Sequence, residues 1–204
     1  MTINTTIFDW SGVISDDFQA VYNSSMKIFD IYNRPGITAD EFRDSIENPS
    51  KKFWQKMVPW ARMDDVQRHF DILIRDEVRK PLPGAKDTLS FLNGKGISMY
   101  VVSSHPQTIL EEEARSYGIY DYFLGIYGSN YYKDRRLARV VGDRNLDKNT
   151  TLFVEDMLEG LLAGKQIGIK TAALLSGYHS EERLRQANPD YIFQNITGLK
   201  TLFQ

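Results

Sequence analysis

After residue 80, the sequence alternates between short apolar runs and segments whose apolar residues recur at helical spacing. Parallel strands need a crossover connection, usually a helix, to return the chain to the same end of the sheet. This order therefore predicts an α/β fold with a parallel sheet covered by helices on both faces. We expect strands at 97–102, 123–127, 151–154, 171–175 and 191–193. We expect helices at 85–93, 108–117, 137–141 and 158–166.

A further strand is expected at the start of the chain, where the apolar pair Ile7-Phe8 leads directly into Asp9. Ligands of open parallel sheets bind in the crevice at the carboxyl ends of the strands. Asp9 would stand at that end, and Gly12 would let the chain turn away sharply. Asp, Ser and Gly are also ordinary turn residues, so this stretch alone does not establish a site.

The segment between this first strand and residue 80 has a different pattern. Apolar residues recur at helical spacing over 18–32 and again over 66–78. Thr38 and Glu41 form a capping-box pattern that predicts the start of another helix. We therefore predict two units, which are a core domain made of 1–15 and 81–204 and a small all-helical cap domain of 16–80.

The composition restricts the classes of partner. The chain has 204 residues, a formal charge of −2 and no cysteine. It therefore has no disulfide and no thiol nucleophile, and its charge gives no footprint for nucleic acid. No apolar run is long enough to span a membrane, and no signal peptide is visible. We expect a cytoplasmic protein without a nucleic-acid or membrane partner, and its state as a monomer or a homodimer stays open.

Three of the expected strands end in polar residues that can share one crevice. Asp9 follows the first strand, Ser103 follows the strand at 97–102, and Asp156 follows the strand at 151–154. Lys133 comes after the second of these residues. Each residue alone is typical of a turn, a helix cap or a solvated surface, but their shared position after apolar strands predicts a common site.

This set of residues suits phosphoryl transfer. A carboxylate nucleophile repels a phosphate dianion, and a divalent cation held by Asp9 and Asp156 would offset that repulsion. Oxygen ligands from a few carboxylates suit Mg²⁺. Asp9 would attack phosphorus and form an aspartyl-phosphate. Ser103 and Lys133 would stabilise the charge of the transferred group.

The order of these pieces resembles the haloacid dehalogenase-like (HAD) hydrolase superfamily over nearly the whole chain. The similar stretches are Asp9-Trp10-Ser11-Gly12-Val13, Val101-Val102-Ser103-Ser104, Lys133-Asp134 and Phe153-Val154-Glu155-Asp156. The resemblance implies a Rossmann-like three-layer sandwich with a parallel sheet and a helical cap inserted after the first stretch. It also implies a phosphatase-like hydrolase.

The resemblance assigns a role to each candidate residue. Catalysis would depend on Asp9 as nucleophile, with Ser103 and Lys133. The implied Mg²⁺ ligands are Asp9, the main-chain carbonyl of Ser11, Asp156 and Glu155. The implied substrate-binding residues are Ser11, Gly12, Ser103, Ser104 and Lys133. The implied substrate is a small phosphorylated metabolite.

Two positions depart from the family pattern. Ser11 stands where phosphatases of the superfamily have the aspartate that protonates the leaving oxygen, and Gly160 stands where another acid is common. These positions favour a phosphatase that is slow on alkyl phosphates. Phosphonoacetaldehyde hydrolases share both features, so C–P bond hydrolysis through a Schiff base on Lys51 or Lys52 is an alternative. A phosphate-binding protein without turnover is another.

Overall fold

The computed structural model describes residues 2–129 and 132–204. Its centre is a six-stranded sheet in the order β5-β4-β1-β6-β7-β8, and every neighbouring pair is parallel. The predicted parallel α/β sheet is thus confirmed. The strands are β1 (Thr5–Phe8), β4 (Ser98–Val102), β5 (Gly125–Tyr127), β6 (Thr151–Glu155), β7 (Lys170–Leu174) and β8 (Tyr191–Phe193).

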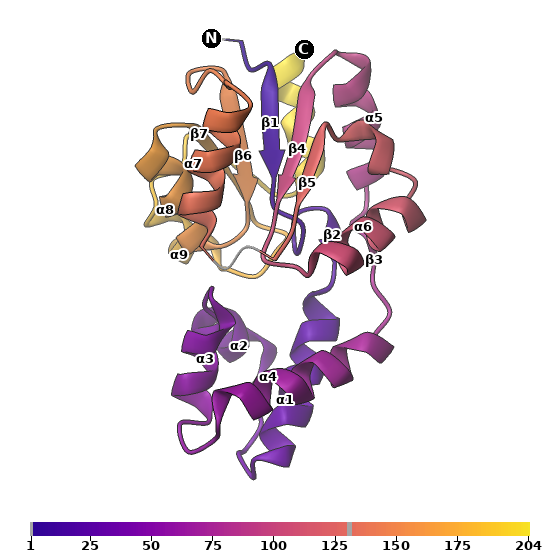
Figure 1. Cartoon of the computed structure of the whole chain (residues 1–204). Coiled ribbons are helices and arrows are strands. Elements are labelled where there is room, and N and C mark those ends of the chain that lie inside the picture. The colour runs from indigo at the N-terminus through magenta and orange to yellow at the C-terminus, as the bar shows by residue number, and fades with distance from the viewer. Residues whose placement is uncertain (1, 130–131) are drawn as a thin grey trace.

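Helices cover both faces of this sheet (Figure 1). Ile7 of β1 packs on one face with Leu137 and Val140, whereas the next residue, Phe8, packs on the other face with Leu89. Successive side chains of a strand point to opposite faces, so β1 contributes to two apolar layers. The first face carries α7 (Lys133–Asp143) and α8 (Leu158–Ile167), and the second carries α5 (Ala85–Gly94), α6 (Gln107–Ser116) and η3 (Ile196–Phe203).

Four helices lie beyond the carboxyl ends of the central strands (Figure 1). They are α1 (Phe18–Ile31), α2 (Ala39–Ser45), α3 (Ser50–Met57) and α4 (Met63–Leu73). Their apolar side chains form a separate cluster that includes Phe29, Phe42 and Phe53, and Met157 and Tyr178 of the sheet part join it. The capping box of Thr38 and Glu41 is present. In the described part of the chain, no helix has the length and apolar character needed to cross a membrane.

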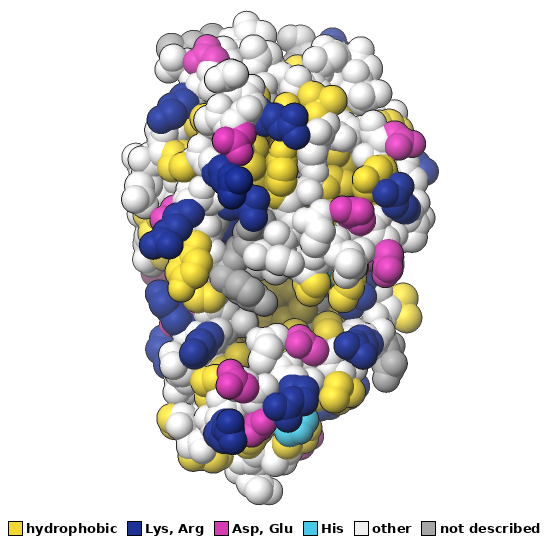
Figure 2. Space-filling view, in the orientation of Figure 1, with side chains coloured by type: hydrophobic (Ala, Val, Ile, Leu, Met, Phe, Trp, Pro, Cys, Tyr) yellow, Lys and Arg dark blue, Asp and Glu magenta, His cyan; other side chains and the backbone are white. Residues whose placement is uncertain are grey.

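The helical segment is connected to the sheet part at two short strands. β2 (Ser15–Asp16) and β3 (Lys80–Pro81) pair antiparallel, so the chain enters and leaves the helical segment side by side. Figure 2 shows a hollow between the two parts, with hydrophobic side chains at its floor. The carboxyl end of β1 therefore faces the junction of the two parts.

Some elements differ from the sequence-based expectation. The helix expected at 137–141 is the longer α7, which begins at Lys133. Its first turn is basic, and a basic stretch has no apolar periodicity to reveal a helix. The pair β2–β3, the short helix α9 (Glu181–Arg185) and three 3₁₀ segments of the described residues were not expected. β2 and β3 have two residues each, which is too few to show a strand pattern. The 3₁₀ segments are η1 (Ile74–Asp76), η2 (Tyr120–Tyr122) and η3.

Candidate active site

Three buried carboxylates lie together at the carboxyl ends of β1 and β6. Asp9 follows β1, and its main-chain N–H donates to the carbonyl of Val154 at 2.9 Å. Glu155 ends β6 and Asp156 follows it. An oxygen of each of the three acids lies within 4.8 Å of an oxygen of the other two. The parallel pairing of β1 with β6 therefore brings together residues that are more than a hundred positions apart in the sequence.

Lys133 is the cation of this cluster. Its Nζ donates to Asp9 Oδ2 and to Glu155 Oε2, each at 2.6 Å, and its side chain is only 6% exposed. Burial alone would lower the pKa of Lys133, but the charges of Asp9 and Glu155 outweigh it and raise that pKa. The lysine is therefore held in its charged form.

The cluster contains three carboxyl groups, of which Lys133 pairs with two. Burial and the charge of Asp9 raise the pKa of Glu155, and the same two causes raise the pKa of Asp156 to about 7. Oδ1 of Asp9 and Oδ1 of Asp156 are buried and have no hydrogen-bond partner in the described residues. Buried carboxylate oxygens without donors fit a hard divalent cation, so this cluster can hold a metal ion.

Glycines determine how closely the chain approaches these acids. Gly12 has φ +70°, and a Cβ there or at Gly177 would overlap the carboxylate of Asp156. Between them, Asp156 Oδ2 accepts a hydrogen bond of 2.7 Å from the main-chain N–H of Tyr178. Gly12 has the left-handed conformation expected of a sharp turn after Asp9, and it lies against a candidate metal ligand.

Gly160 packs directly against the side chain of Glu155. A Cβ at Gly160 would overlap Oε2 of Glu155, the oxygen that accepts from Lys133. The other oxygen, Oε1, accepts from the main-chain N–H groups of Asp156 and Met157, each at 3.1 Å. The side chain of Glu155 therefore fills the space that a side chain at position 160 would need.

Ser103 lies at the same edge of the sheet, after β4. Its side chain is buried, its main-chain N–H donates to Tyr127, and its Oγ accepts from the main-chain N–H of His105 at 3.2 Å. Within residues 2–129 and 132–204, no hydrogen bond joins Ser103 to Asp9 or Lys133. Ser104 is half-buried beside it. The pairing of β4 with β1 brings these serines to the same end of the sheet as Asp9.

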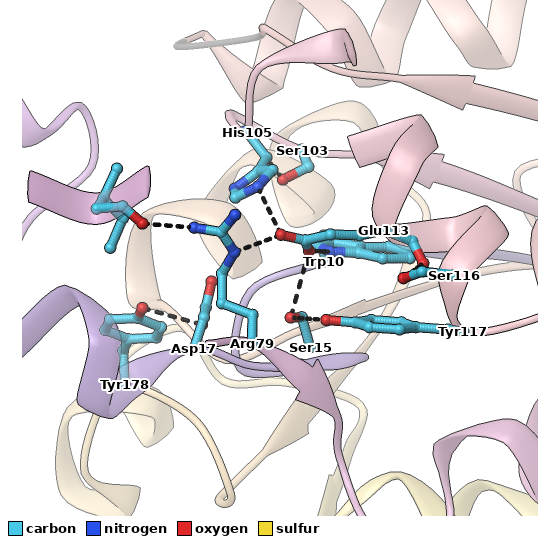
Figure 3. Close-up of polar contacts among 11 residues, drawn as sticks. Trp10, Ser15, Asp17, Arg79, Ser103, His105, Glu113, Ser116, Tyr117 and Tyr178 are labelled. Atoms are coloured by element: carbon cyan, nitrogen blue, oxygen red, sulfur yellow. Dashed lines mark hydrogen bonds and ion pairs between the residues drawn. The ribbon is translucent and has the colours of Figure 1, made fainter. Parts of the chain in front are cut away.

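Ser11 is half-buried and has an acidic neighbour that the sequence did not single out. Burial raises the pKa of Asp17 to about 6, while a hydrogen bond from Ser11 acts in the opposite direction. The hydroxyl of Tyr178 donates to Asp17 Oδ1 at 3.0 Å (Figure 3). The signal available in the sequence was the pair Asp16-Asp17 at the start of a helical segment, which also fits an ordinary helix start.

A second missed residue is Glu113 of α6. It is buried, and it accepts hydrogen bonds from Trp10 and Arg79 (Figure 3). Leu110, Ala114 and Tyr117 lie three before, one after and four after it, so it is an acid on the apolar face of its helix. That position was the signal that could have identified it.

A pocket of about 370 Å³ lies where α3 meets α7 and α8. Lys52 lines it, as do Lys133 and Gly160, whereas Lys51 does not, although both lysines are exposed. The two lysines that the sequence left equivalent are therefore distinguished by their position. The other lining residues are Asn48, Pro49, Tyr132, Asp134, Glu159, Leu162, Ala163 and Gln166.

Comparisons with known proteins identify the family to which this chain is similar. A family model of haloacid dehalogenase-like hydrolases matches residues 6–174. Pyrophosphatase PpaX of Halalkalibacterium halodurans is 21% identical over 207 residues, covering 98% of this chain and 96% of that protein. A phosphoglycolate phosphatase of Vibrio vulnificus is 21% identical over 215 residues, covering 97% of this chain and 94% of that one.

Solved structures share the fold. A haloacid dehalogenase-like hydrolase from Streptococcus pneumoniae superimposes with a TM-score of 0.90 at 19% identity, covering 99% of each chain. The family-model match runs from Thr6, inside β1, to Leu174 at the end of β7. It therefore contains all of the candidate residues, from Asp9 to Asp156.

Proposed function

We propose that this chain, which belongs to the haloacid dehalogenase-like hydrolase family, is a magnesium-dependent phosphatase of a small phosphorylated metabolite. Family membership and the phosphatase names of its relatives support a phosphatase-like hydrolase. The observation that carries the finer proposal is the buried group of Asp9, Glu155 and Asp156 around Lys133. PpaX and the Vibrio relative are named for pyrophosphate and phosphoglycolate, which makes both compounds the first substrates to test.

The two oxygens of Asp9 would have different tasks. Lys133 binds Oδ2 and fixes the orientation of the carboxylate, while Oδ1 has no hydrogen bond from the described chain. In our proposal Asp9 attacks phosphorus, the bond to the leaving oxygen breaks with its electron pair, and an aspartyl-phosphate forms. Water then hydrolyses this intermediate and releases phosphate. Ser103 and Lys133 would donate hydrogen bonds to the phosphoryl oxygens.

Mg²⁺ would be held by Asp9, Asp156 and the main-chain carbonyl of Ser11, with Glu155 as a further or outer ligand. When bound, it supplies positive charge that offsets the repulsion between the carboxylates and the phosphate. The free oxygens of Asp9 and Asp156 support this assignment. We also propose that residues 16–80 act as a cap over the core formed by 1–15 and 81–204, because their helices face the carboxyl ends of the strands (Figure 1).

Trapping of the intermediate tests the mechanism. Acid quenching of the enzyme during turnover of a ³²P-labelled aryl phosphate should leave label on the wild-type protein. The Asp9→Asn variant should carry none, and Asp16→Asn, which changes a half-exposed neighbour, should be labelled normally. If the wild type releases no phosphate and forms no adduct, but phosphate or vanadate raises its melting temperature, the non-catalytic binding protein is favoured instead.

Ser11 predicts a strong dependence on the leaving group. A hydroxyl lacks the low pKa of a general acid, so the leaving oxygen must take its proton from water. General acid catalysis is typically worth about 10²–10⁴-fold, and the deficit should be greatest for alkyl phosphates. Ser11→Asp should raise the alkyl rate. Because buried Asp17 adjoins this position, the Ser11→Asp/Asp17→Asn double variant tests the acid without charge repulsion. No increase in either variant contradicts this role for Ser11.

C–P bond hydrolysis remains a second candidate because Lys52 lines the pocket that contains Lys133. Phosphonoacetaldehyde with borohydride should then attach covalently to the wild type and to Lys51→Met, but not to Lys52→Met. An absence of adduct in all three proteins eliminates the Schiff-base mechanism.

A further inference from the structure

Glu113 lies at the centre of a buried polar network that connects segments far apart in the sequence (Figure 3). Trp10 donates from Nε1 to Glu113 Oε2 at 2.7 Å. Arg79 donates from Nε to Oε1 of the same carboxylate, and both side chains of this ion pair are nearly buried. One carboxylate of α6 therefore bonds the residue that follows Asp9 and the residue that precedes β3.

The contacts of Trp10 fix the loop that follows Asp9. Its ring stacks on Tyr117 with centroids 5.7 Å apart and an interplanar angle of 4°. The hydroxyl of Tyr117 is 2.9 Å from Oγ of Ser15, at the other end of the same loop. The indole is thus held on its face by Tyr117, the residue after α6, and at its N–H by Glu113.

A second set of contacts connects Glu113 to Ser103 through His105. Nε2 of His105 lies 3.5 Å from Glu113 Oε1. The main-chain N–H of His105 donates to Ser103 Oγ. Glu113 therefore contacts Trp10, which follows Asp9, and His105, which is bonded to Ser103.

A third set of contacts connects Glu113 to the helical segment through Arg79. Arg79 donates from one terminal nitrogen to the carbonyl of Ile74 at 3.0 Å, and Ile74 begins the 3₁₀ turn that follows α4. A change in the position of α4 relative to the sheet would therefore pull on Arg79, and Arg79 is bonded to the same carboxylate as Trp10.

We propose that Glu113 is a positioning residue, which fixes the loop after Asp9 and makes its placement depend on the helical segment through Arg79. This inference rests on the proposed phosphatase activity. It assigns no contact with substrate to Glu113. It requires that loss of the carboxylate affects turnover more than substrate binding, because the nucleophile becomes misplaced while the pocket stays intact.

The matched pair of variants is Glu113→Gln and Glu112→Gln, since Glu112 is the exposed neighbour on the same helix. With an aryl phosphate, Glu113→Gln should lower kcat by about tenfold or more and leave KM within about twofold. Glu112→Gln should match the wild type. Arg79→Met should lower kcat as well, and adding it to Glu113→Gln should cause little further loss because both remove one connection. Additive losses, or an unchanged kcat in Glu113→Gln, overturn the proposal.

Tryptophan fluorescence gives a readout that does not depend on activity. The chain has three tryptophans, so Trp54→Phe/Trp60→Phe leaves Trp10 as the reporter. In this background, Glu113→Gln should shift Trp10 emission to the red and expose it to iodide quenching while the far-ultraviolet circular dichroism stays native. Unchanged emission overturns the proposal even if the wild type shows no phosphatase activity. If Glu113→Gln does not fold, Arg79→Met supplies the same measurements.

Discussion

Lys133 joins Asp9, which follows β1, to Glu155, the last residue of β6, through two hydrogen bonds of 2.6 Å from a single ammonium group. Because all three side chains are buried, the ammonium offsets the repulsion between two carboxylates as well as orienting them. The stability of the site and its proposed chemistry therefore depend on the same lysine.

Replacement of Lys133 should lower the free energy of unfolding. Lys133→Met leaves Asp9, Glu155 and Asp156 buried without a cation, and loss of one partner of a buried pair typically costs about 3–5 kcal/mol. Urea unfolding should show a loss of this size, whereas Lys148→Met, at an exposed position, should unfold like the wild type. A loss below about 1 kcal/mol would mean that the cluster does not need this charge.

Metal binding should appear as stabilisation. An ion that binds only the folded protein at about one hundred times its Kd stabilises it by about 2.7 kcal/mol. We expect Mg²⁺ to raise the melting temperature of the wild type relative to EDTA and to have little effect on Asp156→Asn. Equal shifts in both proteins would show that the ion binds somewhere other than these acids.

Two glycines on neighbouring helices form a natural control for each other. Gly160→Ala places a methyl group onto the carboxylate of Glu155, while Gly142 of α7 has open space around its Cβ position. Gly160→Ala should destabilise the protein by about 1–3 kcal/mol, as overpacking does. Gly142→Ala should be neutral or stabilising by up to about 1 kcal/mol, since alanine is the better helix former. Chemical denaturation of both variants tests this; equal behaviour would contradict the close packing at Gly160.

Glu113 should contribute stability that disappears in acid. Burial alone would raise the pKa of this carboxyl, but contacts with His105, Trp10 and Arg79 outweigh it and lower the pKa from 4.5 to about 2. A depressed acid stabilises the folded state above its unfolded pKa, and this contribution falls as the pH drops from about 4.5 towards 2. The unfolding free energies of wild type and Glu113→Gln should therefore differ by about 2 kcal/mol more at pH 7 than at pH 3. A pH-independent difference would show that the ion pairs of Glu113 do not stabilise the fold.

The sheet and the residues at its edge could be predicted because their signals are local. An apolar run that ends in a polar residue is visible in a few letters, and the carboxyl ends of parallel strands meet by a general rule. Asp9, Ser103 and Asp156 were found in this way, and the structure brings all three to one edge. Lys133 was identified by its order in the chain, while its ion pairs depend on where α7 begins.

The contacts around the site could not be predicted because each joins distant segments. Trp10 and Glu113 are 103 positions apart, and neither residue type indicates a partner by itself. Asp17 precedes a helix, where an acid is common, and its bond with Tyr178 joins positions 161 apart. The sequence shows only that Gly160 stands where an acid is common, whereas the structure shows the side chain of Glu155 beside it.

The contact between Glu155 and Gly160 has a consequence for the evolution of such chains. A relative that gains a side chain at the second position must shorten or turn the acid at the first, so the two sites should change together. A side chain gained at position 160 while Glu155 is still present would clash with it, so we expect the replacement of Glu155 to come first.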